Sequence, residues 1–273
     1  MARKLFCEIC PLTYHISVQK NVITRHIRDF FSKEKFAKEK SLEKLPVTVC
    51  EHKSIIRRVL GNTDMTLQEN KAVNLSIAAP KVNGILIKPG ETFSFWKTVG
   101  KSTAAKGYRE GLIIASAKTG SAVGGGMCQF SNLLHWMVLH SPLEISEHHH
   151  HDGYDLFPDF DRKIPFGTGT SISYNYVDYR IKNTTPDTYQ IIVYVTDTHL
   201  CGELRSVKEP DTEYLIESEG EHFVRENGEV FRKGRVYRSC IDKKTGNLIS
   251  KTCIRENHAK VMYDTRHLEI IEK

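Results

Sequence analysis

The chain has 273 residues, of which 40% are hydrophobic and 26% are charged, and its formal net charge is +6. This is the composition of an ordinary globular protein, and it argues against a small scaffold that depends on disulfides or metals. No window approaches the roughly 20 apolar residues of a membrane-spanning helix, and no nucleic-acid-binding motif is present. We therefore expect neither a transmembrane segment nor a nucleic-acid partner.

The first residues and the cysteines favour a cytoplasmic location. Glu8, Pro11 and His15 interrupt the apolar stretch that a secretory signal requires. The seven cysteines are odd in number and widely spaced, which fits a thiol-rich cytoplasmic protein better than a secreted disulfide scaffold.

A helix is predicted at 22–44, because apolar residues recur near helical spacing in its first half and Pro46 follows its charged second half. The segment from Lys20 to Arg58 holds eleven Lys or Arg against five Asp or Glu. Such a basic stretch fits either an anionic surface, such as a membrane face, or a solvated helix of mixed charge.

A second helix is predicted at Thr66–Ala79. Thr66 can cap it, Glu69 stands three residues later as a capping box requires, and Pro80 ends it. Residues 85–96 then predict two short strands around a Pro-Gly turn.

The centre of the chain combines a strand, a glycine triplet and a helix. The strand is predicted at Gly111–Ala117, and the glycines at 124–126 follow it. Cys128 then opens a helix that runs to about His140, with apolar residues on one face and Pro142 beyond its end.

From Ser171 onward the pattern changes to strands, with the strongest β-prone runs at Tyr189–Val195 and Leu200–Val207. Asn227-Gly228 then predicts a hairpin in the tail. The fold class is therefore predicted as α+β: an N-terminal helical region, a central Gly-Gly-Gly-x-Cys helix, an antiparallel sheet and a small β-rich C-terminal appendage. The predicted parts are 1–63, 64–207 and 208–273.

Several short segments carry a resemblance to a known family. In chain order they are Asn74 with its helix, Asn83-Gly84, Pro89 to Phe95, Gly107-Tyr108, Gly124 to Gln129, the histidines after Glu147, and Asp178 to Asn183. The chain resembles the VanW family, an accessory group associated with vancomycin-type glycopeptide resistance, so 64–207 is predicted to be a VanW-like domain. The resemblance is closest to the intracellular branch of that family. It implies a biological setting and leaves the reaction open.

One stretch departs from the family pattern. An aspartate often stands in the family where this chain has Phe166-Gly-Thr-Gly-Thr170. If that aspartate orients a catalytic histidine, its role is missing here or has passed to another residue.

Cys128 is the candidate nucleophile. At the start of a helix, unpaired backbone N–H groups and the helix dipole favour the thiolate, which is the nucleophilic form. The backbone from Gly126 to Gln129 could stabilise an oxyanion, and the Gln129 amide could donate a further hydrogen bond. The alternative is a small buried cysteine that packs behind a tight glycine turn.

The run His148 to His151 supplies candidate bases, because a cysteine nucleophile needs an imidazole within reach. On a strand, alternate residues share a face, so His149 and His151 are expected to pair, and the resemblance also favours these two as a His-x-His pattern. Asp152, Asp155 or Asp159 could orient one ring.

The same run also allows metal binding. His149 and His151, with Asp152 or Cys128, could hold Zn²⁺, although no cofactor is otherwise expected. A third interpretation is a polar histidine loop with incidental metal affinity.

These features support three functional hypotheses within the setting of cell-wall precursor metabolism. The first is a cysteine-dependent hydrolase or acyl-transfer enzyme that acts on a peptide or amide bond. The second is a non-catalytic protein that binds a peptidoglycan precursor, another peptide-like substrate, or a partner protein of the resistance cluster. The third is a metal-dependent hydrolase that uses the histidines. The sequence sets no oligomeric state.

Overall fold

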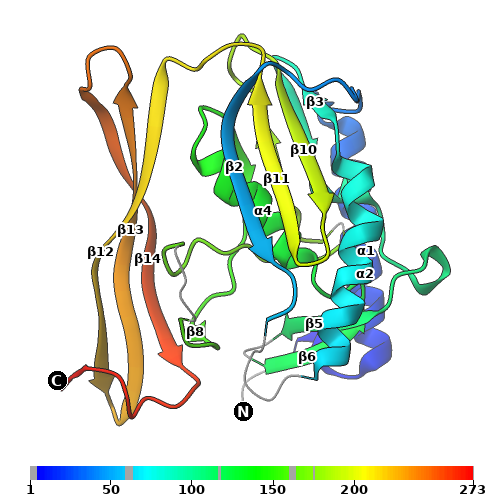
Figure 1. Ribbon diagram of the computed structural model, residues 1–273. Helices are drawn as coiled ribbons and strands as arrows, with labels where there is room; N and C mark the ends of the chain where they lie inside the picture. The colour runs from blue at the N-terminus through cyan, green and yellow to red at the C-terminus, as the bar shows by residue number, and fades with distance from the viewer. Residues whose placement is uncertain (1–4, 59–63, 116–117, 160–163, 175, 273) are drawn as a thin grey trace.

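The computed structural model describes residues 5–58, 64–115, 118–159, 164–174 and 176–272, and it is a mixed α+β structure (Figure 1). Its main body holds a four-stranded antiparallel sheet of β2 (Val47–Ile55), β11 (His199–Ser206), β10 (Tyr189–Val195) and β3 (Ile85–Ile87), in that order. Helix α4 (Met127–Leu139) packs on β2 and β11, and helix α2 (Met65–Val82) packs on β10. This helix-on-sheet layer contains the core.

Glycine brings α4 close to this sheet. A Cβ atom at Gly202, in β11, would lie 2.8 Å from side-chain atoms of both Leu133 and Met137 of α4. Because carbon atoms do not approach so closely, a side chain at residue 202 would have to displace the ends of both core side chains, and glycine avoids this. Leu133 and Met137 are each 1% exposed, so the contact is part of the main hydrophobic core.

A second sheet lies on the other side of the core. It orders β1 (Lys35–Phe36), β4 (Glu91–Ser94), β9 (Arg180–Lys182) and β7 (Glu144–Glu147), and the short helix α3 (Phe95–Val99) continues from β4. Phe93, Phe95 and Tyr179 from these elements are fully buried. Beside them stand the 3₁₀ turn η2 (Ala104–Lys106) and the hairpin of β5 (Glu110–Ala115) and β6 (Lys118–Val123).

The C-terminal part is a long, separate sheet that stands beside the main body (Figure 1). It orders β15 (Ile270–Glu272), β12 (Thr212–Glu226), β13 (Glu229–Asp242), β14 (Leu248–Val261) and β8 (Tyr154–Asp155). The β12–β13 hairpin closes at the predicted Asn227-Gly228, whose φ angles of 52° and 81° are those of a two-residue turn. Arg238 of β13 donates to Leu139 O at 2.8 Å, which ties this sheet to the end of α4.

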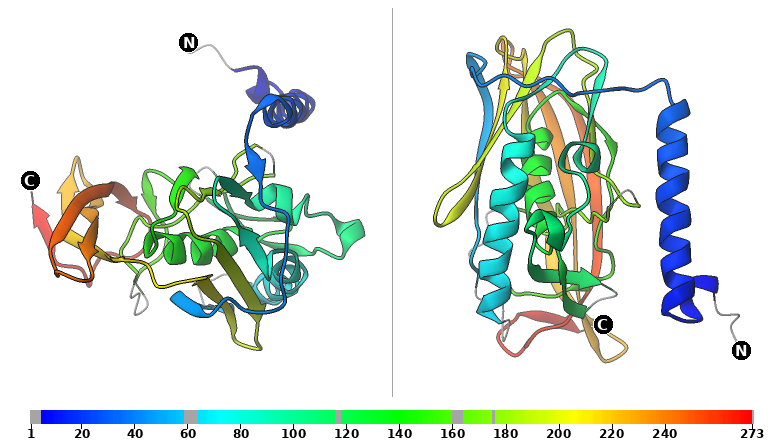
Figure 2. Two further views of the ribbon diagram at one scale, coloured as in Figure 1. Left: turned by 90° about the horizontal axis from the view of Figure 1, so that it is seen from above. Right: turned by 90° about the vertical axis from the view of Figure 1, so that its right-hand side faces the viewer.

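The N-terminal helix differs from its prediction. After the 3₁₀ turn η1 (Phe6–Glu8), α1 covers Pro11–Phe31, whereas the sequence predicted a helix at 22–44. Pro11 occupies the first helical position, where its missing N–H is not needed, and Ser32 is extended and ends the helix. The charged residues beyond it enter β1. Figure 2 shows α1 at the edge of the molecule in both views.

Two further predictions need correction. Helix α2 begins one residue before Thr66, because the Asp64 carboxylate accepts from Thr66 N at 2.8 Å and is the cap. It also runs through Pro80, which stands in its last turn. The strand predicted from Ser171 is replaced, within the described residues of that segment, by an isolated bridge between Ser173 and Val177.

The division into 1–63, 64–207 and 208–273 stays a prediction. Within the described ranges, no helix combines the length and the apolarity needed to cross a membrane.

Candidate functional site

The candidate site begins with a clamp on the glycine turn before α4. The Asn74 amide donates to Arg109 O and to Gly125 O, both at 2.9 Å, and its oxygen accepts from Arg109 N at 2.8 Å. Asn74 is fully buried, so these bonds are shielded from water. They fix the turn relative to α2 and β5.

The turn tolerates no side chain. A Cβ at Gly125 would lie 2.1 Å from Gly111 O, and a Cβ at Gly126 would lie 2.2 Å from Lys71 Cγ. Gly126 is the residue before α4 and has a φ of 100°, a left-handed conformation that favours glycine. The glycines are therefore needed both for the reversal of the chain and for the close approach of the turn to Gly111 and Lys71.

Cys128 is the second residue of α4, so the helix begins one residue earlier than predicted, and the electrostatics of Cys128 also differ from the expectation. Burial raises the pKa of the Cys128 thiol above its ordinary value, and a hydrogen bond from the backbone of Ile172 offsets this only in part. The expected lowering of the pKa by the helix N-terminus is therefore outweighed by burial, although the residue as a whole has intermediate exposure.

Backbone donors at the start of α4 remain available. No side chain caps the helix, and among the described residues the N–H groups of Gly126 and Met127 have no hydrogen-bond acceptor, whereas the N–H of Cys128 bonds its own sulfur. Gln129, in contrast, is engaged: its amide donates to Ser54 Oγ and to Ile55 O, both at 2.8 Å. It anchors α4 to the end of β2, while the backbone N–H groups keep the capacity to bind a negative oxygen.

The histidines alternate in facing, as expected for an extended segment. His148 and His150 turn inward: their ring centroids are 4.0 Å apart, and His148 stacks on the buried His135 at 4.1 Å. Burial lowers the pKa of His148 to about 4, so this ring is neutral at pH 7. His149 and His151 are exposed.

Glu147 takes the orienting role that the sequence assigned to nearby aspartates. Its carboxylate lies 3.1 Å from His149 Nε2. The three aspartates are instead paired with arginines of the C-terminal sheet, Asp152 with Arg255 and both Asp155 and Asp159 with Arg232. The sequence could not reveal these pairs because their partners lie far away along the chain.

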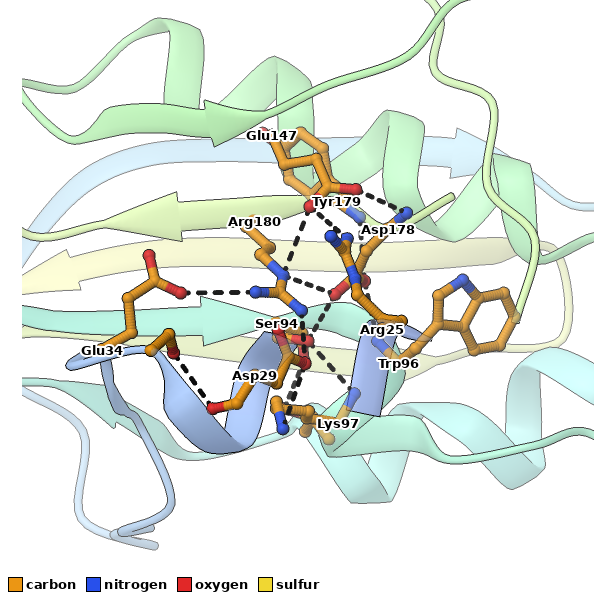
Figure 3. Close-up of polar contacts among 12 residues, drawn as sticks. Arg25, Asp29, Glu34, Ser94, Trp96, Lys97, Glu147, Asp178, Tyr179 and Arg180 are labelled. Carbon is orange, nitrogen blue, oxygen red and sulfur yellow. Dashed lines mark hydrogen bonds and ion pairs between the residues drawn. The ribbon is translucent and has the colours of Figure 1, made fainter. Parts of the chain in front are cut away.

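A buried ionic network, which the sequence did not reveal, surrounds Arg180 (Figure 3). Its guanidinium lies within 4 Å of the carboxylates of Asp29, Glu34, Glu147 and Asp178. Asp178 also accepts from Ser94 Oγ at 2.5 Å and from Trp96 N at 3.0 Å. The network joins α1, β4 and β9 to Glu147, and thereby fixes the position of His149.

The nucleophile and the bases are not in contact. Between the described residues, no hydrogen bond joins the Cys128 sulfur to a histidine ring. The described residues also include no group of three or more His, Cys, Asp or Glu side chains arranged to hold a metal ion. The roles predicted for Cys128, His149, His151, Gln129 and Gly126, and the metal candidate Asp152, stay predictions.

Comparison with known proteins shows which family the chain resembles. A family model described as VanW like protein matches residues 70–205. The Vancomycin B-type resistance protein VanW of Enterococcus faecalis is 38% identical over 200 residues, which cover 73% of this chain and 72% of that protein. The uncharacterized protein YoaR of Bacillus subtilis is 30% identical over 118 residues, 42% of this chain and 36% of its own length. No solved structure matches the chain.

The raised pKa of Cys128 predicts slow alkylation at neutral pH. Because burial disfavours the thiolate, its reaction with iodoacetamide should reach half-maximal rate above the ~8.5 of a free cysteine. Peptide mass spectrometry, with the exposed Cys253 as internal control, measures both thiols in one sample. A midpoint for Cys128 below that of Cys253 would contradict the burial argument.

Proposed function

Because the chain belongs to the VanW family, we propose that it acts in vancomycin-type glycopeptide resistance, in or near cell-wall precursor metabolism. We further propose that it is a cysteine-dependent hydrolase or acyl-transfer enzyme for a peptide or amide bond. The resistance setting comes from the name of the Enterococcus faecalis relative. The chemistry is argued from the first turn of α4.

One observation supports the chemistry: a thiol and unbonded N–H groups share the first turn of α4. Attack on an amide carbonyl turns its oxygen into an oxyanion, and backbone N–H groups held rigidly nearby stabilise that charge. The Asn74 clamp supplies the rigidity, because it fixes the carbonyl of Gly125 immediately before these donors. Such preorganisation is what an oxyanion hole requires.

The proposed reaction has two balanced steps. Cys128 Sγ attacks the carbonyl carbon and the carbon–nitrogen bond breaks, giving a thioester and a free amine that takes up the thiol proton. Water, or an acceptor amine, then attacks the thioester, returns the proton to Cys128 and releases the acid or the new amide. His149 carries the proton between sulfur and nitrogen through a water molecule, with Glu147 orienting its ring.

A second candidate function is non-catalytic binding at the same place. One observation favours it: burial keeps Cys128 in its thiol form. The stretch 166–170 also lacks the acid that the family resemblance leads us to expect there. In this case the turn and α4 bind a peptidoglycan precursor or a partner protein of the resistance cluster, and the sulfur takes no part in a reaction.

Substitution at Cys128 separates the two candidates. For the enzyme, Cys128→Ala should abolish both resistance in cells and any covalent adduct with a peptide thioester in vitro. His149→Ala should slow the reaction by about 100-fold, the size of a general-base contribution. The matched control is Cys253→Ala, which removes an exposed thiol and should leave resistance unchanged. Full resistance in Cys128→Ala would reject the enzyme and leave the binding function.

A further inference from the structure

A largely buried lysine stands beside the first turn of α4. Lys71, on α2, is 7% exposed, and among the described residues its ammonium has no hydrogen bond and no carboxylate partner. The stem of the side chain is enclosed, but its Nζ atom still reaches the surface and can therefore meet a dissolved anion.

The Lys71 side chain lies across the glycine that precedes α4. A Cβ at Gly126 would meet Cγ of Lys71 at 2.2 Å and Cδ at 2.9 Å. Arg57 and Arg58 add positive charge nearby, and together with burial they lower the pKa of Lys71 to about 8. Arg57 is already held by Glu69, at 2.6 and 2.8 Å. The surroundings of Lys71 therefore attract an anion.

A second buried side chain lacks partners on the same face of α2. Gln68 is fully buried, and neither its amide nitrogen nor its amide oxygen has a hydrogen-bond partner. It precedes Lys71 by three residues, so the two side chains are neighbours on the helix surface. An amide with two unsatisfied atoms in a protein interior destabilises the fold unless a ligand or a water molecule completes its hydrogen bonds.

We propose that Lys71, Gln68 and the N–H groups at the start of α4 bind an oxyanion, and that this oxyanion is the carboxylate of a peptide-like substrate. A helix N-terminus favours anions, and the lysine adds a full charge. The assignment to a substrate rests on the proposed function, whereas the oxyanion site itself does not. An anchored carboxylate places the neighbouring amide bond of the ligand beside the Cys128 sulfur.

The proposed site predicts a specific order of binding affinities among small peptide ligands. Isothermal titration calorimetry should show that N-acetyl-alanyl-alanine binds the wild-type chain, that its C-terminal amide binds at least tenfold more weakly, and that Lys71→Met reduces the affinity for the free acid by a similar factor. The matched control Lys101→Met removes an exposed lysine and should change nothing. Equal binding of acid and amide, or unchanged binding in Lys71→Met, would overturn the proposal.

Two additional arms separate the outcomes. Inorganic phosphate that binds in a Lys71-dependent manner, while the peptide does not bind, would keep the oxyanion site and overturn its assignment to a carboxylate. Cys128→Ala should bind the peptide acid as wild type does, so loss of the reaction and loss of the anion site are seen independently. If Lys71→Met fails to fold, the ¹³C shift of Lys71 Cε in the wild-type chain replaces it: the anion should raise the pKa of Lys71, and an unchanged pKa would count against the site.

The outer face of α1 is apolar and exposed. Leu12, Ile16, Ile23, Ile27 and Phe30 are each at least 50% exposed and form one stripe along the helix. The opposite side of α1 meets the body through ions, Arg25 with Glu147 and Asp29 with Arg180. Figure 2 shows that the helix lies at the edge of the molecule, so the stripe has no cover within the described chain.

The charges on α1 indicate which kind of partner can cover this stripe. Lys20 and Arg28 are exposed on α1, and the one acidic side chain of the helix, Asp29, is buried in its ion pairs. Two copies of such a helix would repel each other, whereas an anionic lipid surface attracts it. We propose that α1 lies in the headgroup region of an anionic membrane, with the stripe buried among the lipid chains.

Vesicle sedimentation tests the lipid surface. The full chain should sediment with vesicles of phosphatidylglycerol and phosphatidylcholine in equal parts, and weakly with phosphatidylcholine alone. The double variant Ile23→Ser, Ile27→Ser should lose most of this binding, while Leu42→Ser, at a side chain that is 95% exposed outside the helix, should keep it. Absence of binding, equal binding by the double variant, or a solution dimer that the double variant dissociates would overturn the proposal.

Discussion

The side chain of Asn74 makes the hydrogen bonds on which the site depends. One buried amide satisfies the carbonyl groups of Arg109 and Gly125 and the N–H of Arg109, and so joins α2, β5 and the glycine turn at a single point. The position of the turn determines where the N–H groups at the start of α4, the Cys128 thiol and the contact between Gly126 and Lys71 lie. Loss of the amide would leave the carbonyl of Gly125 and the N–H of Arg109 without this partner, while the carbonyl of Arg109 would keep the hydrogen bond from Gly124 N. An unpaired buried carbonyl is more unfavourable than the loss of an exposed bond.

Local patterns predicted most of the β structure and the central helix. The run Tyr189–Val195 is a strand with those bounds, and Asn227-Gly228 closes a hairpin, because strong β propensity and a two-residue turn act through near neighbours. The N-terminal helix was predicted too late in the chain. The apolar residues that suggested a buried face, such as Ile23 and Ile27, are exposed, and the real attachment is made by Arg25 and Asp29 to distant partners.

The residues of the candidate site could be predicted from the sequence, but their surroundings in the fold could not. The glycine triplet, Cys128 and the alternation of the histidines follow from local sequence. The burial that raises the pKa of Cys128 comes from the packing of the folded chain, and only the fold brings the backbone N–H of Ile172 to the sulfur. The partner of His149 is Glu147 because the nearby aspartates form ion pairs with arginines of the C-terminal sheet. Lys71 could not be predicted as a site residue, because the sequence alone does not show that a helical lysine is largely buried; its packing against Gly126 in the fold shows this.

The most direct measurement is a crystal structure of the Cys128→Ala variant with a bound N-acetylated dipeptide. We expect the ligand carboxylate to lie within hydrogen-bond distance of Lys71 Nζ and of the N–H groups at the start of α4. The amide carbonyl carbon of the ligand should face residue 128. A carboxylate bound elsewhere, or a carbonyl turned away from residue 128, would contradict the claim that the first turn of α4 is where this protein recognises and transforms its substrate.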